Sequence, residues 1–442
     1  MTLFRALART ALALAAALAL AAPAAAQLRI TVTGGDFRPI ALAMPAFLGD
    51  DAQSRTAGDD IARVVEADLT GSGLFRVVPR EAHIETIDGV DATPDFPSWA
   101  AINAEALVVG HARVETDGRI SARFRLYDVA AGRQMTGFEF FAAPQAWRRI
   151  AHKISDAIYA ALTGEEGYFD SRIVFVDETG PKGDRVKRLA LMDQDGANLR
   201  YLSDGRDLVL MPRFSPTDQT ILFISYATGE PQIYLYNIDT GQRELLGRFP
   251  GMSFAPRFAP DGRSVLMSLS QNGNTDIFLM ELATRTLRRL TSAPSIETSP
   301  SFSPDGSQIV FESDRGGQPQ IYVMDTAGGE ATARRISFGD GRYGTPVWSP
   351  RGDLIAFTKQ SGGRFSVGVM RADGGGEREL DGGYHAEGPT WAPNGRVLAY
   401  FKESPGERGS PTLWAADIAG LNRRRLDTPN AASDPAWSPL LP

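Results

Sequence analysis

The stretch Ser299-Pro300-Ser301-Phe302-Ser303-Pro304-Asp305-Gly306 is one of six related copies along the carboxyl-terminal part of the chain. Each copy has two prolines four residues apart, with an aromatic residue between them. Successive copies are 44, 44, 46, 43 and 46 residues apart, a period typical of propeller blades or helical solenoids. The copies are Pro212/Phe214/Pro216, Pro256/Phe258/Pro260, Pro300/Phe302/Pro304, Pro346/Trp348/Pro350, Pro389/Trp391/Pro393 and Pro435/Trp437/Pro439.

The residues between the copies favour blades. After the turn signal Pro304-Asp305-Gly306, short apolar or alternating runs occupy 309–311, 321–325 and 334–337. None of them keeps helical spacing over the ten or more residues that a solenoid helix needs. Four short strands in each repeat predict a propeller blade.

The two ends of the repeat array determine the number of blades. Residues 171–203 hold three strand-like runs with no Pro-x-aromatic strand before them, and residues 434–439 form such a strand with nothing after it. Pairing these two pieces completes a sixth blade and leaves no open sheet edge. The sequence therefore predicts a mostly β protein with a six-bladed β-propeller over 171–442, closed by 434–439.

The start of the chain has the pattern of a secretory signal peptide. Arg5 and Arg9 precede an Ala/Leu run over 11–22, and Ala24-Ala25-Ala26 supplies a cleavage site. The alternative, a membrane anchor, needs about 20 apolar residues, and Pro23 interrupts the run before that. We expect residues 1–26 to be removed and the mature protein to be exported to the periplasm, without direct membrane insertion.

Composition excludes some classes of function. The chain has no cysteine, so it forms neither disulfides nor thiolate metal sites. Its formal net charge of −7 argues against a nucleic-acid partner, which favours a basic surface.

Residues 27–164 lack the repeat and predict a small α/β domain. Strands are expected at 28–32, 40–44 and 75–78, a helix over 55–69, and a short helix with Ser98 as its N-cap. A three-stranded meander over 106–141 and a helix over 144–162 complete the domain. Residues 165–170 are expected to be the linker to the propeller.

The search for reaction chemistry gives no catalytic, cofactor-binding or metal-binding residue. The G-x-S-x-G motif of a hydrolase nucleophile is absent, and the four histidines include no helical zinc pair. His152 is expected to be a packed or surface histidine. The turn aspartates, such as Asp305, bond their own backbone more often than they bind calcium. The one-per-blade aromatics favour packing between blades over a sugar-stacking ring.

The two faces of the predicted propeller differ. Turns between the first and second and between the third and fourth strands share one face, here called the turn face, and are short and stereotyped. The loops between the second and third strands and between blades share the other, here called the loop face, and vary in length and content. Variable loops on a rigid scaffold usually carry binding, so we expect a partner on the loop face.

Several stretches of the sequence, taken together, resemble a known family. The carriers are the signal-like start, Gly73-Leu74-Phe75-Arg76-Val77, Phe124-Arg125-Leu126-Tyr127-Asp128, Gly164-Glu165-Glu166-Gly167-Tyr168-Phe169 and the six Pro-x-[Phe/Trp]-[Ser/Ala]-Pro copies. A chain with these stretches in this order resembles the TolB family, the periplasmic propeller components of the Tol-Pal system. Single blade motifs also occur in prolyl oligopeptidase-like propellers, so the order of both domains carries the resemblance.

The resemblance implies a monomeric, non-enzymatic adaptor. Its propeller mouth is expected to bind the peptidoglycan-associated lipoprotein Pal, and its amino-terminal segment the carboxyl-terminal domain of TolA, supporting outer-membrane integrity and constriction at cell division. The residues that it assigns to the Pal face are Met252, Ser253, Ala255, Glu297, Thr298, Tyr343, His385 and Glu387. Those that it assigns to the TolA segment are Gln27, Leu28, Arg29, Ile30, Thr31 and Val32.

Two alternatives remain open. A propeller enzyme acting on periplasmic glycan or peptide is the first. A peptidase needs a large second domain that the 143 nonrepeat residues of 27–169 do not supply, whereas a glycan lyase needs clustered acid and base residues in the channel, which the sequence does not exclude. A free-standing propeller that binds a small substrate or an ion is the second.

Overall fold

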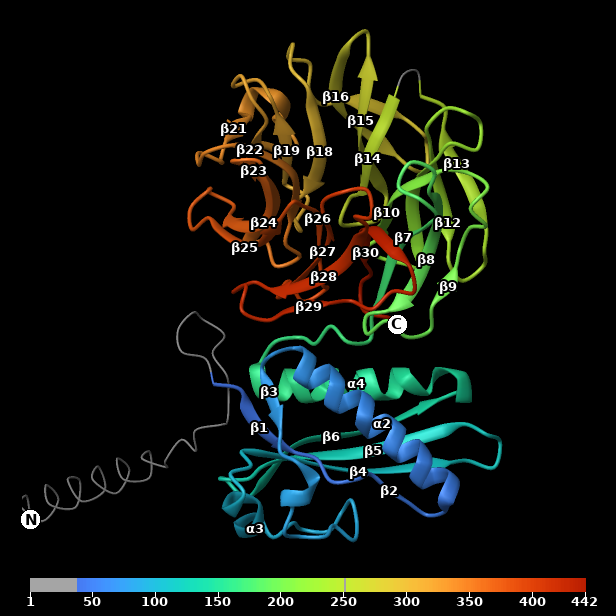
Figure 1. The fold of residues 1–442 in the computed structure, drawn as a ribbon, viewed down its shortest axis with the longest axis vertical. Helices are drawn as coiled ribbons and strands as arrows, with labels where there is room; N and C mark the ends of the chain where they lie inside the picture. The colour runs from blue at the N-terminus through green and yellow to red at the C-terminus, as the bar shows by residue number, and fades with distance from the viewer. Residues whose placement is uncertain (1–37, 250–251) are drawn as a thin grey trace, which may run out of the picture.

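The structure is a computed structural model that describes residues 38–249 and 252–442, with the backbone alone for Met252 and Ser253. The predicted signal peptide (1–26) and the segment Gln27 to Val32 lie outside the described residues. Figure 1 shows two domains in contact, an α/β domain and a propeller, and the fold is mostly β, with 46% strand and 13% helix. Across the described ranges, no helix combines the length and apolar character needed to cross a bilayer.

The amino-terminal domain is a sheet with helices on both faces. The sheet has the order β3-β1-β4-β5-β6, with β2 beside β4 and β1 parallel to both of its neighbours. Its strands are β1 (Ile40–Ala43), β2 (Leu48–Gly49), β3 (Phe75–Val77), β4 (Ala106–Val114), β5 (Ile120–Asp128) and β6 (Arg133–Ala142). Its helices are α2 (Ala52–Gly71), α3 (Phe96–Ala101) and α4 (Trp147–Thr163), with short 3-10 turns η1 (Arg80–Ala82) and η2 (Pro144–Ala146).

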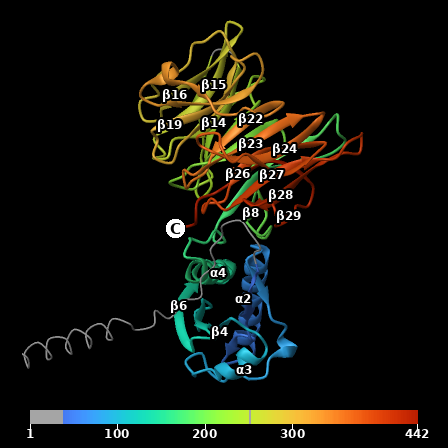
Figure 2. The same ribbon diagram turned by 90° about the vertical axis from the view of Figure 1, so that its left-hand side faces the viewer.

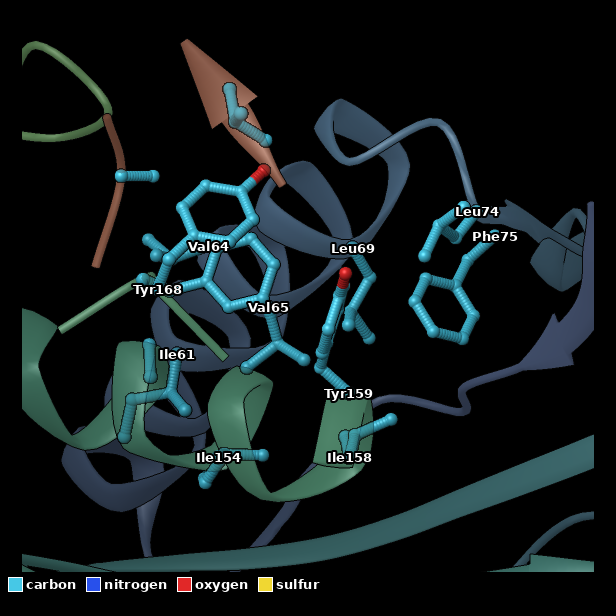
Figure 3. Close-up of a cluster of buried hydrophobic side chains, with 14 of the residues drawn as sticks. Ile61, Val64, Val65, Leu69, Leu74, Phe75, Ile154, Ile158, Tyr159 and Tyr168 are labelled. Atoms are coloured by element: carbon cyan, nitrogen blue, oxygen red, sulfur yellow. The ribbon is translucent and has the colours of Figure 1, made fainter. Parts of the chain in front are cut away.

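The two long helices have clear end signals and share one core. Asp51 caps α2 by accepting a hydrogen bond from the Ser54 amide at 2.7 Å, and Gly164 ends α4 with a left-handed φ of 75°. Their apolar residues face each other in Figure 3, where Tyr159 and Tyr168 join the same cluster. In Figure 2, α4 lies toward the propeller and α3 at the far end of the domain.

The expected N-cap of α3 is wrong. Asp95 occupies the cap position, without a side-chain cap bond, and Ser98 lies inside the helix, where its hydroxyl donates to the Asp95 carboxylate. The helix starts earlier because Pro97 fits its first turn, where a missing N–H costs nothing.

The predicted six-bladed propeller is confirmed, as six four-stranded antiparallel sheets. From the channel outward, blade 1 is β10 (Val209–Phe214), β11 (Thr220–Ser225), β12 (Gln232–Asn237) and β13 (Arg243–Gly247); blade 2 is β14 (Met252–Phe258), β15 (Ser264–Gln271), β16 (Asn274–Glu281) and β17 (Leu287–Arg289); blade 3 is β18 (Glu297–Phe302), β19 (Gln308–Ser313), β20 (Gln320–Asp325) and β21 (Arg334–Arg335). Blade 4 is β22 (Arg342–Trp348), β23 (Leu354–Ser361), β24 (Arg364–Arg371) and β25 (Arg378–Gly383); blade 5 is β26 (His385–Trp391), β27 (Val397–Glu403), β28 (Pro411–Asp417) and β29 (Arg423–Arg425); blade 6 is β30 (Ala431–Trp437), β7 (Arg172–Thr179), β8 (Val186–Asp193) and β9 (Arg200–Tyr201). The turn η3 (Gly329–Thr332) lies between β20 and β21.

Blade 6 joins the two ends of the propeller. β30 pairs antiparallel with β7, with Trp437 opposite Ile173. The Trp437 indole donates to the Ser171 hydroxyl at 2.8 Å, and the Ser438 amide donates to the Arg172 carbonyl at 2.8 Å. The last strand of the chain thereby covers the edge that β7 would otherwise expose.

Each innermost strand contains a β-bulge just before the first proline of its motif. The strand register shifts there in all six blades, and the residue before each proline has a positive φ, between 46° and 68°. These residues are Met211, Ala255, Ser299, Thr345, Gly388 and Asp434. The proline lacks an amide hydrogen, and a bulge is the part of a strand where that donor is not needed.

The motif aromatics pack against the preceding blades, as expected. Trp348 lies in one buried cluster with Val310 and Val323 of blade 3. The Trp391 indole donates to the Val347 carbonyl of blade 4 at 3.0 Å. These contacts join neighbouring blades along the length of the channel wall.

Candidate functional site

The turn face of blades 5 and 6 is where the amino-terminal domain docks. Arg396 forms a two-pronged ion pair with Glu165, with one Nε to Oε2 distance of 2.6 Å. Asn394 donates its side-chain amide to the Glu166 carbonyl at 3.1 Å, and Asn422 donates to the Gly71 carbonyl at the end of α2 at 2.7 Å. The turn face is therefore partly occupied within this chain.

The residues expected to form a linker are a packed part of this junction. Tyr168 and Phe169 are each 1% exposed, and their ring centroids lie 4.4 Å apart. Tyr168 also contacts Trp437 edge-on at 5.8 Å. The Asp170 carboxylate accepts two hydrogen bonds from Arg149, at 3.0 and 2.9 Å, and the Asp170 backbone carbonyl accepts one from the Leu441 amide at 2.8 Å. The segment thus fixes the domains to each other.

A buried polar network crosses the same junction. Asp68 of α2 accepts hydrogen bonds from His152 Nδ1 at 2.7 Å, from Ser155 at 2.9 Å and from the Gln194 side chain at 2.8 Å. Asp195 pairs with Arg148 and lies 3.8 Å from His152 Nε2. Burial opposes a charged imidazole, but the carboxylates of Asp68 and Asp195 outweigh it and raise the pKa of His152 to about 9.

This network also contains the atoms of a possible metal cluster. Ligand atoms of Asp68, His152 and Asp195 lie within 4.8 Å of one another. However, Asp68 already accepts three hydrogen bonds, and the Arg148 guanidinium neutralises Asp195. A protonated histidine between two carboxylates explains the arrangement without an ion. His152 is packed, as the sequence indicated, and its role is to join the domains.

The loop face has an acidic mouth at the channel opening, which we define by Glu312, Glu387 and Asp434 of three different blades. Burial, with the nearby carboxylate of Glu387, raises the pKa of Glu312 to about 6. Burial also raises the pKa of Asp434, and Glu387 adds to this effect. The Glu387 carboxylate thus acts on both of the other carboxylates. Sequence reasoning missed Glu312 and Asp434, because it searched only the loops before the innermost strands and took motif positions as structural.

His385 lies beside this acidic mouth. Its Nε2 is 2.8 Å from Glu387 Oε2 and its Nδ1 is 3.7 Å from Glu403 Oε2. The hydrogen bond with Glu387 raises the pKa of His385. Its ring lies edge-on against Phe365 and Phe401. His385 and Glu387 therefore form one partly exposed polar unit at the mouth, with 28% and 34% of their side chains exposed.

The other residues expected on the Pal face differ in exposure. Ala255 is half-buried in the blade 2 bulge, and Thr298 is half-buried in β18. Glu297 is fully buried and accepts hydrogen bonds from Ser313 at 3.0 Å and Arg315 at 3.1 Å. Tyr343 is 1% exposed and its hydroxyl donates to Glu377 at 2.7 Å. The side chains of Met252 and Ser253 lie outside the described part of the structure.

The fold and the site define a two-domain protein in which a six-bladed propeller carries a docked α/β domain on one face and presents an acidic mouth on the other. Two family models match in the same order: the TolB amino-terminal domain over 28–135 and the TolB beta propeller domain over 159–441. The chain belongs to the TolB family.

Two similar proteins agree with this assignment. The chain is 56% identical over 254 residues to the Tol-Pal system protein TolB of Paramagnetospirillum magneticum, an alignment that spans 58% of this chain and 57% of that protein. It also resembles the crystal structure of TolB from Acinetobacter baumannii, with 30% identity, a TM-score of 0.79, and coverage of 93% of this chain and 100% of that one.

Proposed function

We propose that this component of the Tol-Pal system is a non-enzymatic periplasmic adaptor. It binds Pal through the propeller mouth on the loop face and TolA through the mature amino-terminal segment, and so supports outer-membrane integrity and constriction at cell division. The family match and the similarity to the Tol-Pal system protein TolB of Paramagnetospirillum magneticum support a role in the Tol-Pal system. The signal pattern of residues 1–26 supports the periplasm.

The observation that carries the proposal is that, within the described residues, one propeller face contacts the amino-terminal domain and the other does not. Arg396, Asn394 and Asn422 hold the amino-terminal domain against the turn face. The acidic mouth lies at the opposite end of the channel, among the loops that vary most between blades. Rigid scaffolds commonly bind through such loops. A partner with basic or hydrogen-bond-donating groups complements the carboxylates of Glu312, Glu387 and Asp434.

Within the proposed Pal face, buried and accessible residues have different roles. His385, Glu387, Ala255 and Thr298 reach the mouth and are the proposed contacts. Glu297 and Tyr343 hold the loops in place through Arg315 and Glu377. Glu297 is fully buried, so a change there removes its hydrogen bonds with Ser313 and Arg315 inside the fold and does not test binding.

Glu387→Lys is the sharper test. The Glu387 side chain is 34% exposed, so the variant should fold. Loss of an interface anchor typically costs about 2 kcal/mol or more, roughly a thirtyfold loss of affinity. Calorimetry with purified Pal measures this change. Asp261→Lys is the matched control, because Asp261 is exposed in a turn on the opposite face. Equal losses of Pal affinity in both variants would contradict Pal binding at the loop face.

The proposed TolA segment requires its own experiment. Deletion of residues 27–34 should abolish binding of the TolA carboxyl-terminal domain and spare Pal binding, since the two proposed sites are separate. Calorimetry with each partner distinguishes the two effects. Unchanged TolA affinity in the deletion variant would show that residues 27–34 do not bind TolA. A parallel loss of Pal binding would show that the deletion affects the propeller.

A further inference from the structure

The turn-face half of the propeller channel is a cavity of about 380 Å³ that the proposed partner sites do not use. The position between the first proline and the aromatic of each motif copy lines it. Four of the six copies place Ser301, Val347, Thr390 and Ala436 there, and two adjacent copies place Arg213 and Arg257. Two adjacent blades therefore place positive charges on the cavity wall, and the other four blades place uncharged side chains there.

Neither of these two arginines forms an ion pair within 4.0 Å with a carboxylate of the described residues. Arg213 donates from Nη1 to the carbonyl of its neighbour Pro212 at 2.7 Å, and its Nε is buried without a partner. For Arg257, the charged group that acts on it is Arg213, which has the same sign. Burial and this repulsion hold the pKa of Arg257 well below its usual value. A buried charge is costly unless an opposite charge compensates it.

Asp434 does not supply that compensation. It is the carboxylate that acts on Arg213, but the two form no ion pair within 4.0 Å in the described structure. Its Oδ2 accepts instead from the Met211 amide at 3.4 Å. Burial raises the pKa of Asp434.

Two hydroxyl groups on the same wall accept hydrogen bonds and donate none within the described residues. Ser301 Oγ accepts the Trp348 amide at 3.2 Å, and Thr390 Oγ1 accepts the Trp437 amide at 3.2 Å. Neither hydroxyl donates to any other described residue. Because a hydroxyl carries one donor besides its acceptor sites, both hydrogens are available to a ligand in the cavity.

We propose that this cavity binds an oxyanion, a phosphate or carboxylate group on a compact molecule, between Arg213 and Arg257. Two guanidinium groups and two hydroxyl donors match the several acceptor oxygens of such a group. The half-buried rings of Phe214, Phe258 and Phe302, together with the motif prolines, give the cavity mouth an apolar rim that suits a small organic substituent. The volume lies in the range of small-molecule sites. The proposal is independent of Pal and TolA binding.

Titration calorimetry of the purified protein with inorganic phosphate, phenyl phosphate and benzoate tests the proposal. We expect saturable binding of one molecule per chain, tighter for phenyl phosphate than for inorganic phosphate because of the apolar rim. Binding of inorganic phosphate alone would assign the site to the free ion, and binding of benzoate would extend it to carboxylates. Arg257→Gln should weaken every probe that binds by at least tenfold. Arg213→Gln is a second variant with the same expected loss.

Controls separate the cavity from general charge and from folding. Arg206→Gln removes an arginine that is 88% exposed and pairs with Asp204 outside the channel, so it should bind each probe as the unmodified protein does. In phosphate-free buffer Arg257→Gln should melt no lower than the unmodified protein, since it removes a half-buried charge that forms no ion pair with a described carboxylate. No saturable binding of any probe, or equal affinity in Arg257→Gln and Arg206→Gln, would overturn the proposal.

Discussion

Arg396 of blade 5 donates hydrogen bonds to both carboxylate oxygens of Glu165, the second residue after α4. This ion pair connects the two domains where the chain passes from one to the other. Arg351 of blade 4 approaches the same carboxylate at 3.6 Å. The side chains of Arg396 and Glu165 are 16% and 18% exposed, so solvent screens them little. The relative placement of the domains thus depends on a specific, nearly buried contact.

Arg396→Gln should loosen the domain junction. The change removes two charge-assisted hydrogen bonds and leaves Glu165 partly buried, which should cost about 2 kcal/mol of unfolding free energy. Chemical denaturation measures the loss, and limited proteolysis should show faster cleavage within residues 165–170. Arg63→Gln is the control, because that arginine is 72% exposed and pairs only within α2. Equal stability of the two variants would contradict the role given to Arg396.

His152 should make the stability of the protein fall at alkaline pH. Its folded pKa of about 9 lies above the ordinary histidine pKa of 6.5, so the folded state binds the proton more tightly than the unfolded state. The resulting stabilisation is fully present below pH 6.5 and is lost as the pH rises toward 9, by about 3 kcal/mol in total. Denaturation curves between pH 6 and 9.5 measure it.

Two variants identify the source of that pH dependence. His152→Gln should remove most of the slope, because no titrating group remains between Asp68 and Asp195. Ser155→Ala removes a different hydrogen bond to Asp68, of 2.9 Å, and should lower stability while keeping the slope. A slope that persists unchanged in His152→Gln would assign it to other groups.

Gly167 should tolerate no side chain. A Cβ atom there would lie 2.0 Å from Asp156 Oδ1 and 2.6 Å from the Asp156 Cα, both far inside van der Waals contact. Asp156 cannot move away freely, since it accepts hydrogen bonds from the Phe169 amide at 2.8 Å and the Asp170 amide at 3.1 Å. Gly167→Ala should therefore destabilise the protein by about 1–3 kcal/mol in thermal or chemical unfolding. Gly183→Ala is the matched control, because a Cβ at Gly183 meets no atom within 4 Å; equal effects of the two would contradict the steric explanation.

Removal of the closing strand should destroy the single cooperative unfolding of the propeller. Deleting residues 434–442 removes the Trp437 contacts with Ser171 and Tyr168 and exposes the edge of β7. An unpaired edge strand promotes aggregation, which size-exclusion chromatography detects. Deleting only residues 440–442 keeps β30 intact and should leave the protein monodisperse. A truncated chain that elutes and melts like the full one would show that closure is not required.

The sequence by itself determined the six-bladed propeller and the elements of the α/β domain. The repeat of Pro-x-aromatic motifs and the split sixth blade carry that information locally, because the period of the pattern follows from strand length and turn chemistry. The expected N-cap Ser98 lies three residues after the observed N-cap, Asp95, because Pro97 fits the first turn of the helix.

Only the tertiary structure decided which charged residues meet. Asp68, His152 and Asp195 lie far apart in the sequence and converge because α2, α4 and a blade 6 turn pack at one junction. The sequence places Glu297 and Tyr343 in variable loops, whereas the structure has them in β18 and β22, where their side chains bond Arg315 and Glu377. The cavity of Arg213 and Arg257 depends on ring closure, which brings six positions more than 40 residues apart onto one channel wall. Local patterns encode strands and turns, whereas burial and charge pairing depend on the packing of distant segments.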